Sequence, residues 1–146
     1  KKEKKIDAST AILFNHDSEF RNKKFLLPRL VKSFVNKDFK FIKDIYKLNV
    51  NGDFSHAEDI CNGIYKLSVT KKKIDMLILS SGKRFYINNI INYLEKYFQY
   101  NIKKKYSVKN LNHRIIGSNK LAKELINYKS VKSPINACKE ILKNYL

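Results

Sequence analysis

The chain has 146 residues, and 43% of them are hydrophobic, which is enough for one globular domain and argues against a disordered protein. Lys and Arg together number 31 against 13 Asp and Glu, so the formal net charge of +18 predicts attraction to anions such as phosphates. No apolar run approaches the roughly 18 residues of a membrane span and no signal segment opens the chain, so we expect a cytoplasmic protein without a membrane partner.

The first half of the chain predicts alternating strands and helices. Residues 8–14 (ASTAILF) form a short apolar run that is typical of a strand buried on both faces, as in a parallel sheet. An apolar stripe at helical spacing predicts an amphipathic helix over residues 25–35. We expect residues 39–46 (FKFIKDIY) to form a strand, and the capping box of Ser55 and Glu58 predicts the start of the next helix.

The second half predicts one more strand and then helices. Residues 74–79 (IDMLIL) indicate a strand, and a clean apolar stripe over residues 87–98 indicates a helix. Ser118 is expected to cap a further helix, and Ser133 followed by Pro134 is typical of the start of a last one. The order of elements predicts an α/β fold in which helices are in the majority.

Polar residues follow the first predicted strand directly. Asn15, His16, Asp17 and Ser18 come where open α/β sheets bind their ligands, at the carboxyl end of a strand. Asn15 can hydrogen-bond a sugar hydroxyl or a phosphate, and His16 can donate to a cofactor amide or phosphate. The alternative is a turn in which Asn and Asp cap the local backbone.

A basic cluster straddles the start of the first predicted helix, and it consists of Arg21, Lys23, Lys24, Arg29 and Lys32. A diphosphate near this helix terminus would meet both the positive side chains and the helix dipole. The alternative is an ordinary solvated face.

The remaining polar and sulfur-containing residues favour structural roles. His56 with Asp53 and Asp59 is a weak ligand set for a metal, and a capping role explains part of this polarity, so no metal is expected. Cys61 and Cys138 lie in helical patterns without neighbouring metal ligands, which predicts buried free thiols.

Four collinear segments resemble GDP-mannose 4,6-dehydratases. Residues 12–25 (ILFNHDSEFRNKKF) are similar to the family segment ILFNHES-P-R-R-G-x-x-F without a gap. Residues 51–59 (NGDFSHAED) resemble K-R-D-W-G-H-A-x-D, residues 79–93 resemble I-A-T-G-x-x-x-S-V-R-E-F-V-E, and residues 115–129 resemble L-x-G-D-x-x-K-A-x-x-x-L-x-W-K. The chain is identified on these motifs as a member of the extended short-chain dehydrogenases/reductases, in their NAD(P)-dependent epimerase/dehydratase group.

The resemblance implies a two-part enzyme, with NADP on an N-terminal Rossmann sheet and the sugar nucleotide on a smaller, helix-rich C-terminal domain. Residues 1–22 are then expected to be a remnant strand and loop of the cofactor-binding domain, and residues 23–146 the sugar-nucleotide-binding domain. The N-terminal half, which would hold most of the NADP and all catalytic residues, is expected to be absent, so this chain alone is expected to be inactive. The intact protein is expected to be a homo-oligomer.

The implied activity is a lyase reaction of fucose biosynthesis, the conversion of GDP-mannose to GDP-4-keto-6-deoxymannose. By position, Asn15 would contact the sugar nucleotide, His16 and Arg21 the cofactor, and Arg29 the diphosphate or its neighbourhood. Gly52 stands where the family has Arg, which removes a charge expected on the diphosphate.

Two alternatives stay open on the sequence. One is another nucleoside-diphosphate-sugar epimerase or dehydratase, favoured by Gly52. The other is a non-enzymatic basic module that binds anions or nucleic acid, favoured by the net charge of +18. Only four of the cationic residues are Arg, the residue preferred for bidentate base contacts, which disfavours nucleic acid as the partner.

Overall fold

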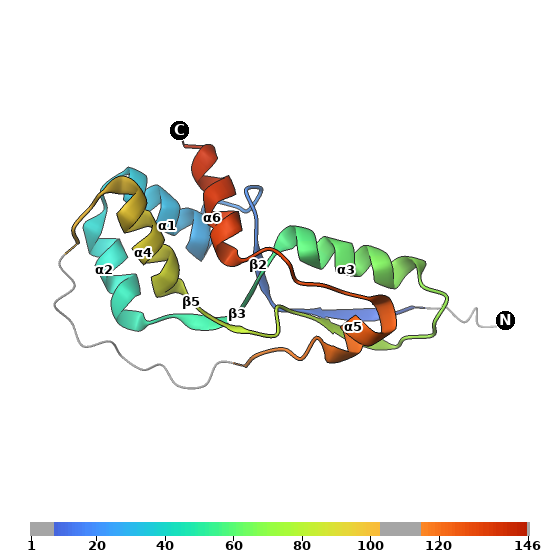
Figure 1. Cartoon of the computed structure of the whole chain (residues 1–146). Helices are drawn as coiled ribbons and strands as arrows, with labels where there is room; N and C mark the ends of the chain where they lie inside the picture. Colours follow the sequence, from blue (N-terminus) through green and yellow to red (C-terminus); the bar gives the residue numbers. More distant parts are fainter. Residues whose placement is uncertain (1–7, 103–114, 146) are drawn as a thin grey trace, which may run out of the picture.

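The computed structural model describes residues 8–102 and 115–145, and its elements mix strands and helices as the sequence predicts (Figure 1). The elements in chain order are β1 (Thr10–Leu13), β2 (Asn15–Asp17), α1 (Leu26–Val35), α2 (Phe39–Leu48), β3 (Asn51–His56), α3 (Ala57–Val69), β4 (Met76–Leu79), β5 (Arg84–Tyr86), α4 (Ile87–Phe98), α5 (Lys120–Ile126) and α6 (Pro134–Lys143). None of the helices within these two ranges has the length and hydropathy that a membrane span requires.

Two small sheets run through the middle of the molecule. β1 and β4 pair in parallel, with Thr10 opposite Met76 and Leu13 opposite Leu79. The second sheet has the order β2-β3-β5, in which β2 is parallel and β5 antiparallel to β3. The chain passes from β1 to β2 within two residues, so the polar residues of β2 lie where the two sheets meet (Figure 1).

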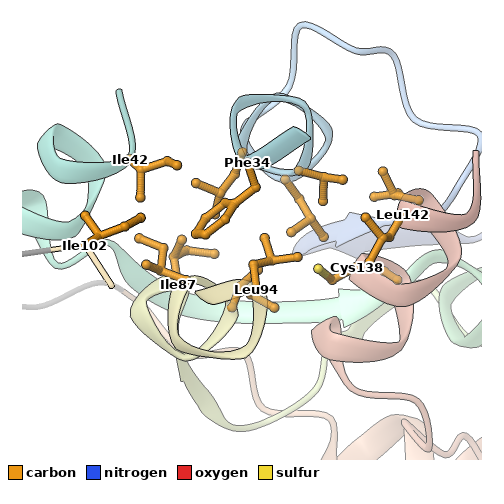
Figure 2. Close-up of a cluster of buried hydrophobic side chains, with 14 residues drawn as sticks. Phe34, Ile42, Ile87, Leu94, Ile102, Cys138 and Leu142 are labelled. Atoms are coloured by element: carbon orange, nitrogen blue, oxygen red, sulfur yellow. The ribbon is translucent and has the colours of Figure 1, made fainter. Parts of the chain in front are cut away.

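Two hydrophobic cores lie on either side of this junction. The larger core fills the space between α1, α2, α4 and α6, where Figure 2 shows the side chains interdigitating. Its most deeply buried residues come from the apolar stripes predicted for α1 and α4, and they include Leu30, Phe34, Ile90 and Leu94, each with no exposed surface. The smaller core joins α3, β4 and α5.

Strand β1 is more exposed than the sequence predicts. Ile12 and Leu13 are 39% and 40% exposed, whereas Leu77 and Leu79 of its partner β4 are 1% and 0% exposed. The expectation of a strand buried on both faces is therefore wrong for the residues described. The physical reason is that, among those residues, β1 has a neighbouring strand on one side only.

The predicted strand over residues 39–46 is instead helix α2. The spacing of its aromatic and aliphatic residues fits the period of a strand and that of a helix. The start of the segment decides for the helix, because the side chain of Asp38 accepts a hydrogen bond from the amide of Phe41 at 3.1 Å. Ile42 is completely buried against the larger core. Tertiary packing and an N-cap thus override a weak strand preference.

Three smaller expectations concern caps. Ser55 lies in β3 and does not start α3, because the cap is His56, whose Nδ1 accepts from the amide of Glu58 at 3.2 Å. The N-cap of α5 is Asn119 instead of the predicted Ser118. The predicted start of α6 at Ser133 and Pro134 is confirmed, with Asn136 completing a capping box.

The two thiols differ in their surroundings. Cys138 is completely buried in the larger core, as predicted, and burial raises the pKa of its thiol to about 12. Cys61 is exposed on α3, so the expectation of a buried thiol is wrong there. The inward face of α3 carries Ile60, Gly63 and Leu67. Cys61 follows Ile60 directly, and one step along a helix turns a side chain by about 100°, away from that face.

Candidate functional site

Asn15 and His16 lie on β2, the edge strand of the three-stranded sheet. Asn15 is exposed, and its side-chain amide donates a hydrogen bond to the backbone carbonyl of Asp53 at 3.1 Å. His16 is half-buried, and its Nδ1 lies 2.8 Å from the carbonyl oxygen of Phe14. Because a carbonyl only accepts, Nδ1 carries the proton, and in the neutral ring Nε2 is left as an acceptor. The amide oxygen of Asn15 and Nε2 of His16 are therefore the groups that can meet a ligand.

Asp17 and Arg21 form an ion pair next to this strand. The Nε of Arg21 lies 3.3 Å from Oδ1 of Asp17, without the alignment of a well-directed hydrogen bond. Burial raises the pKa of the Asp17 carboxyl, and the neighbouring Arg21 and His16 only partly offset this. The guanidinium also stacks on Phe25, 3.7 Å from the ring centroid. Arg21 is thus held between the last residue of β2 and the N-cap of α1, with its charge partly neutralised by Asp17.

Asp53 ties the site to the turn after β4 and to the segment before α5, a role that the sequence did not reveal. Its side chain is completely buried and accepts hydrogen bonds from the amide and hydroxyl of Ser81, from the amide of Gly82 and from the amide of Gly117. The donor distances are 2.8, 2.6, 3.0 and 3.2 Å. Because its backbone carbonyl also receives Asn15, Asp53 fixes β2 relative to the turn after β4.

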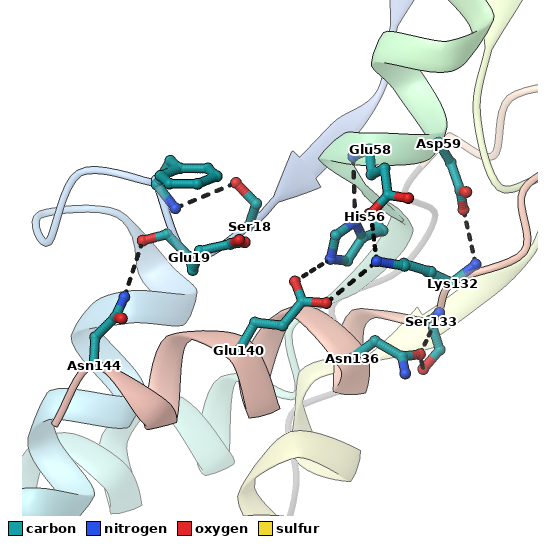
Figure 3. Close-up of polar contacts among 11 residues, drawn as sticks. Ser18, Glu19, His56, Glu58, Asp59, Lys132, Ser133, Asn136, Glu140 and Asn144 are labelled. Atoms are coloured by element: carbon teal, nitrogen blue, oxygen red, sulfur yellow. Dashed lines mark hydrogen bonds and ion pairs between the residues drawn. The ribbon is translucent and has the colours of Figure 1, made fainter. Parts of the chain in front are cut away.

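His56 belongs to a polar network between α3 and α6 (Figure 3). Since its Nδ1 accepts from the amide of Glu58, Nε2 carries a proton and donates to Glu140 at 2.6 Å. Lys132 contacts both Glu58 and Glu140. Burial opposes ionisation of Glu140, but the hydrogen bonds from His56 and Lys132, together with the charge of Lys132, prevail and lower the pKa of this carboxyl.

The carboxylates predicted to surround His56 lie elsewhere. Asp59 accepts from the amides of Val131 and Lys132, both at 2.8 Å, and Asp53 is engaged as described above. The structure instead brings Glu19 near His56 and Glu140, with their ligand atoms within 4.8 Å of one another. The protonated Nε2 makes His56 a hydrogen-bond donor in this arrangement, which fits a structural network.

The basic cluster is assembled around a cavity of about 490 Å³ on the outer face of α1. The cavity is lined by Lys23, Lys24, Arg29, Lys32, Ser33, Asn36 and Asp38. Four of the five predicted basic residues thus come together, and Arg21 does not line the cavity. Three lining residues of α1 and its C-cap Asn36 follow helical spacing, so a charge and polarity pattern with a period of 3.6 could have revealed Ser33 and Asn36 in the sequence.

The four predicted site residues therefore divide into two groups. Asn15 and His16 lie on β2, and Arg21 lies in the loop that follows. Arg29 lies on α1 in the basic cavity, whose lining does not include the other three. The structure thus presents one polar strand and one basic cavity as candidate ligand contacts.

The fold of this chain is that of a known protein family. The model of the family described as GDP-mannose 4,6 dehydratase matches residues 1–133. The chain belongs to this family. No curated protein sequence matches it significantly.

Several solved structures share this fold. UDP-glucuronic acid 4-epimerase from Bacillus cereus, in complex with UDP-glucuronic acid and NAD, is 18% identical with a TM-score of 0.74 over 97% of this chain and 46% of that chain. RMD from Pseudomonas aeruginosa, complexed with NADPH, is 15% identical with a TM-score of 0.71 over 92% of this chain and 46% of that chain. WbmF from Bordetella bronchiseptica, in complex with NADH, is 13% identical with a TM-score of 0.67 over 91% and 44%. The chain spans less than half the length of each.

Proposed function

We propose that this chain is the sugar-nucleotide-binding portion of an NADP-dependent dehydratase that converts GDP-mannose to GDP-4-keto-6-deoxymannose. The observation that carries the proposal is the position of Asn15 and His16 at the junction of the two sheets, within a chain that its family model matches over residues 1–133. Ligands of open α/β folds bind at the carboxyl ends of such strands. A lyase reaction, a role in fucose biosynthesis, a cytoplasmic location and a homo-oligomeric state belong to the same proposal.

In this proposal Asn15 binds and orients the sugar nucleotide. Its side-chain nitrogen donates to the carbonyl of Asp53, so its amide oxygen accepts a hydrogen bond from a hydroxyl of the substrate. Arg29 contacts the diphosphate or its neighbourhood. Its guanidinium lies over the ring of Phe41, 4.3 Å from the centroid, which restricts its motion and leaves its N–H groups available to phosphate.

The cofactor contacts proposed for this chain are peripheral. The chemistry of the donors fits the edge of a dinucleotide: Arg21 supplies a cation for a phosphate, and Nε2 of His16 supplies an acceptor for an amide or hydroxyl group. Bound NADP would supply the hydride chemistry of the reaction. His16 and Arg21 would hold and orient it, together with a cofactor-binding half that this chain does not supply.

We propose the division of residues 1–22 and 23–146 into a cofactor-binding remnant and a sugar-nucleotide-binding domain. Strand β1 falls in the first part, and α1, α4 and α6 with the larger core fall in the second. β1 shares its sheet with β4, so the two parts are joined by hydrogen bonds as well as by the chain.

A second candidate is an epimerase or dehydratase of another nucleoside-diphosphate sugar. Gly52 favours it, because the charge that GDP-mannose dehydratases place there is missing. The B. cereus neighbour, which binds UDP-glucuronic acid, has the same fold over 97% of this chain. Membership of an enzyme family makes the non-enzymatic basic module the less favoured explanation of the charge.

The test is a thermal-shift and calorimetric comparison of GDP-mannose with UDP-glucuronic acid and a dTDP-sugar on this chain. We expect GDP-mannose to give the largest shift, and Asn15→Ala to raise its Kd roughly tenfold, the effect of losing one hydrogen bond to a bound polar group. Asn89→Ala on the exposed face of α4 is the matched control and should leave the Kd unchanged. A larger shift with a UDP- or dTDP-sugar would favour the second candidate. Turnover of GDP-mannose by this chain alone would contradict the assignment of catalysis to another part of the protein.

A further inference from the structure

Gly52 lies between two aromatic side chains on one face of the three-stranded sheet. Phe85 of β5 stands directly opposite Gly52 in the antiparallel register, and Phe54 follows two residues later on β3. Side chains two positions apart along a strand share a face, and so do directly opposite ones. The two rings pack edge to face with their centroids 6.4 Å apart, as this arrangement requires. A side chain at position 52 would therefore stand between Phe54 and Phe85.

The same face of the sheet carries Asn15, the residue proposed to bind the sugar nucleotide. Strands β2 and β3 are parallel, and Asn15 is the register partner of Phe54. Gly52 itself is buried, whereas Phe54 and Phe85 are half-buried and pack against the larger core. Each ring therefore keeps an exposed part, on the face of the sheet that Asn15 shares.

The arginine of β5 does not replace the charge that Gly52 lacks. Arg84 precedes Phe85 on this strand, so its side chain projects from the opposite face of the sheet. Its Nη1 donates to Oδ1 of Asn51 at 2.5 Å, and Asn51 precedes Gly52 on β3 in the same way. The position beside Asn15 where GDP-mannose 4,6-dehydratases have an arginine is thus bordered by two aromatic rings in this chain.

An aromatic surface favours a different part of a ligand than a cation does. The face of an aromatic ring carries the negative part of its quadrupole, so it is attractive to C–H groups and repels a phosphate. A sugar ring presents both C–H groups and hydroxyls. The amide oxygen of Asn15 can therefore accept from a sugar hydroxyl while a phenyl ring contacts the C–H groups of the same sugar.

We propose that Phe54 and Phe85 form an apolar contact surface for the sugar ring of the ligand that Asn15 binds, and that Phe85 excludes a charged side chain from position 52. Phe85 is thereby a specificity-determining residue, because it brings an uncharged part of the ligand to this point of β3 in place of a phosphate. The inference rests on the proposed function, since it concerns the same nucleotide-sugar site, and it adds two aromatic residues to that site.

The first experiment compares GDP-mannose with GDP, which lacks the sugar, by calorimetric titration of the 146-residue chain. Phe85→Leu keeps an apolar side chain for the core but removes the ring. We expect it to raise the Kd of GDP-mannose roughly three- to tenfold, the range for loss of one aromatic contact, and to leave the Kd of GDP unchanged. Tyr86→Leu is the matched control, because Tyr86 is the next residue of β5 and projects from the opposite face. It should change neither Kd.

The second experiment tests the exclusion of charge without any ligand. Gly52→Arg should lower the urea midpoint of unfolding by roughly 1 M, because a long side chain enters a space already bordered by two rings. In the Phe85→Ala background the same substitution should lower the midpoint by less than half as much, since the ring that blocks the arginine is gone. Additive effects of the two substitutions would overturn the claim that Phe85 excludes a side chain from position 52.

The outcomes separate this inference from the proposed function. Equal weakening of GDP-mannose and GDP by Phe85→Leu, or no effect on either Kd, would overturn the sugar contact and leave the proposed function standing. A wild-type chain that binds neither GDP-mannose nor GDP would refute the proposed function and the sugar contact together. The unfolding cycle would then still decide whether Phe85 keeps an arginine out. Selective weakening of GDP-mannose, with non-additive unfolding, supports both parts of the inference.

Discussion

Replacing Asp53 by Asn should remove a large part of the stability of this chain. The carboxylate has no exposed surface and accepts four hydrogen bonds, two on each oxygen. An Asn side chain keeps one oxygen and turns an NH₂ group toward amide donors, so two of these bonds are lost. Hydrogen bonds to a charged group contribute about 1.5–3 kcal/mol each, which gives a loss of roughly 3–6 kcal/mol. Small domains have a total stability of about 5–15 kcal/mol.

Urea unfolding followed by circular dichroism measures this loss. With a slope of about 1–3 kcal/mol per molar urea, the midpoint of Asp53→Asn should fall by roughly 1 M or more. Asp44→Asn is the control, because Asp44 is 56% exposed and lies 3.9 Å from Lys47 in a surface ion pair. Such pairs contribute less than about 1 kcal/mol, so its midpoint should change little. If the two variants unfolded at the same urea concentration, the central position given to Asp53 would be refuted.

Three further predictions concern pH, packing and thiol reactivity. The pKa of Glu140 is lowered in the folded state, so this carboxylate stabilises the fold above the ordinary pKa of 4.5, and the contribution is lost as the pH falls below that value. Glu140→Gln should therefore reduce the dependence of the unfolding free energy on pH in the acid range. Gly63→Ala would place a Cβ 2.8 Å from the buried ring of Tyr128, and we expect a net loss of about 1–2 kcal/mol in urea unfolding. A thiol reagent should label exposed Cys61 at once and buried Cys138 only on unfolding.

Each of these has a result that would contradict it. An unchanged acid limb in Glu140→Gln would remove Glu140 from the network with His56 and Lys132. A neutral or stabilising Gly63→Ala would mean that the Tyr128 ring shifts without cost. Rapid labelling of both thiols in the native chain would contradict the packing of α6 against the larger core.

Local patterns in the sequence were sufficient for most helices. The stripes on α1 and α4 and the Ser133-Pro134 start of α6 are confirmed, because helical periodicity and caps depend on residues within a few positions of one another. The family was also evident from contiguous motifs, and the family model matches the same region of the chain. The gap-free match over residues 12–25 can be recognised from the order of its fourteen residues alone, without knowledge of any distant contact.

The tertiary structure decided what depends on distant residues. Residues 39–46 alternate in a way that suits a strand, and only burial of Ile42 and the Asp38 cap make them a helix. His56 meets Glu140 across 84 positions of the chain, and no local pattern announces such a pair.

The candidate site divides along the same line. The sequence by itself determined that Asn15 and His16 follow a strand and that Lys23, Lys24 and their neighbours form a basic cluster. Only the tertiary structure excluded Arg21 from the cavity, by pairing it with Asp17 and Phe25, and added Asp38 from the next helix. Spacing along a chain specifies which side chains share one element, but the packing of elements determines which of them share one space.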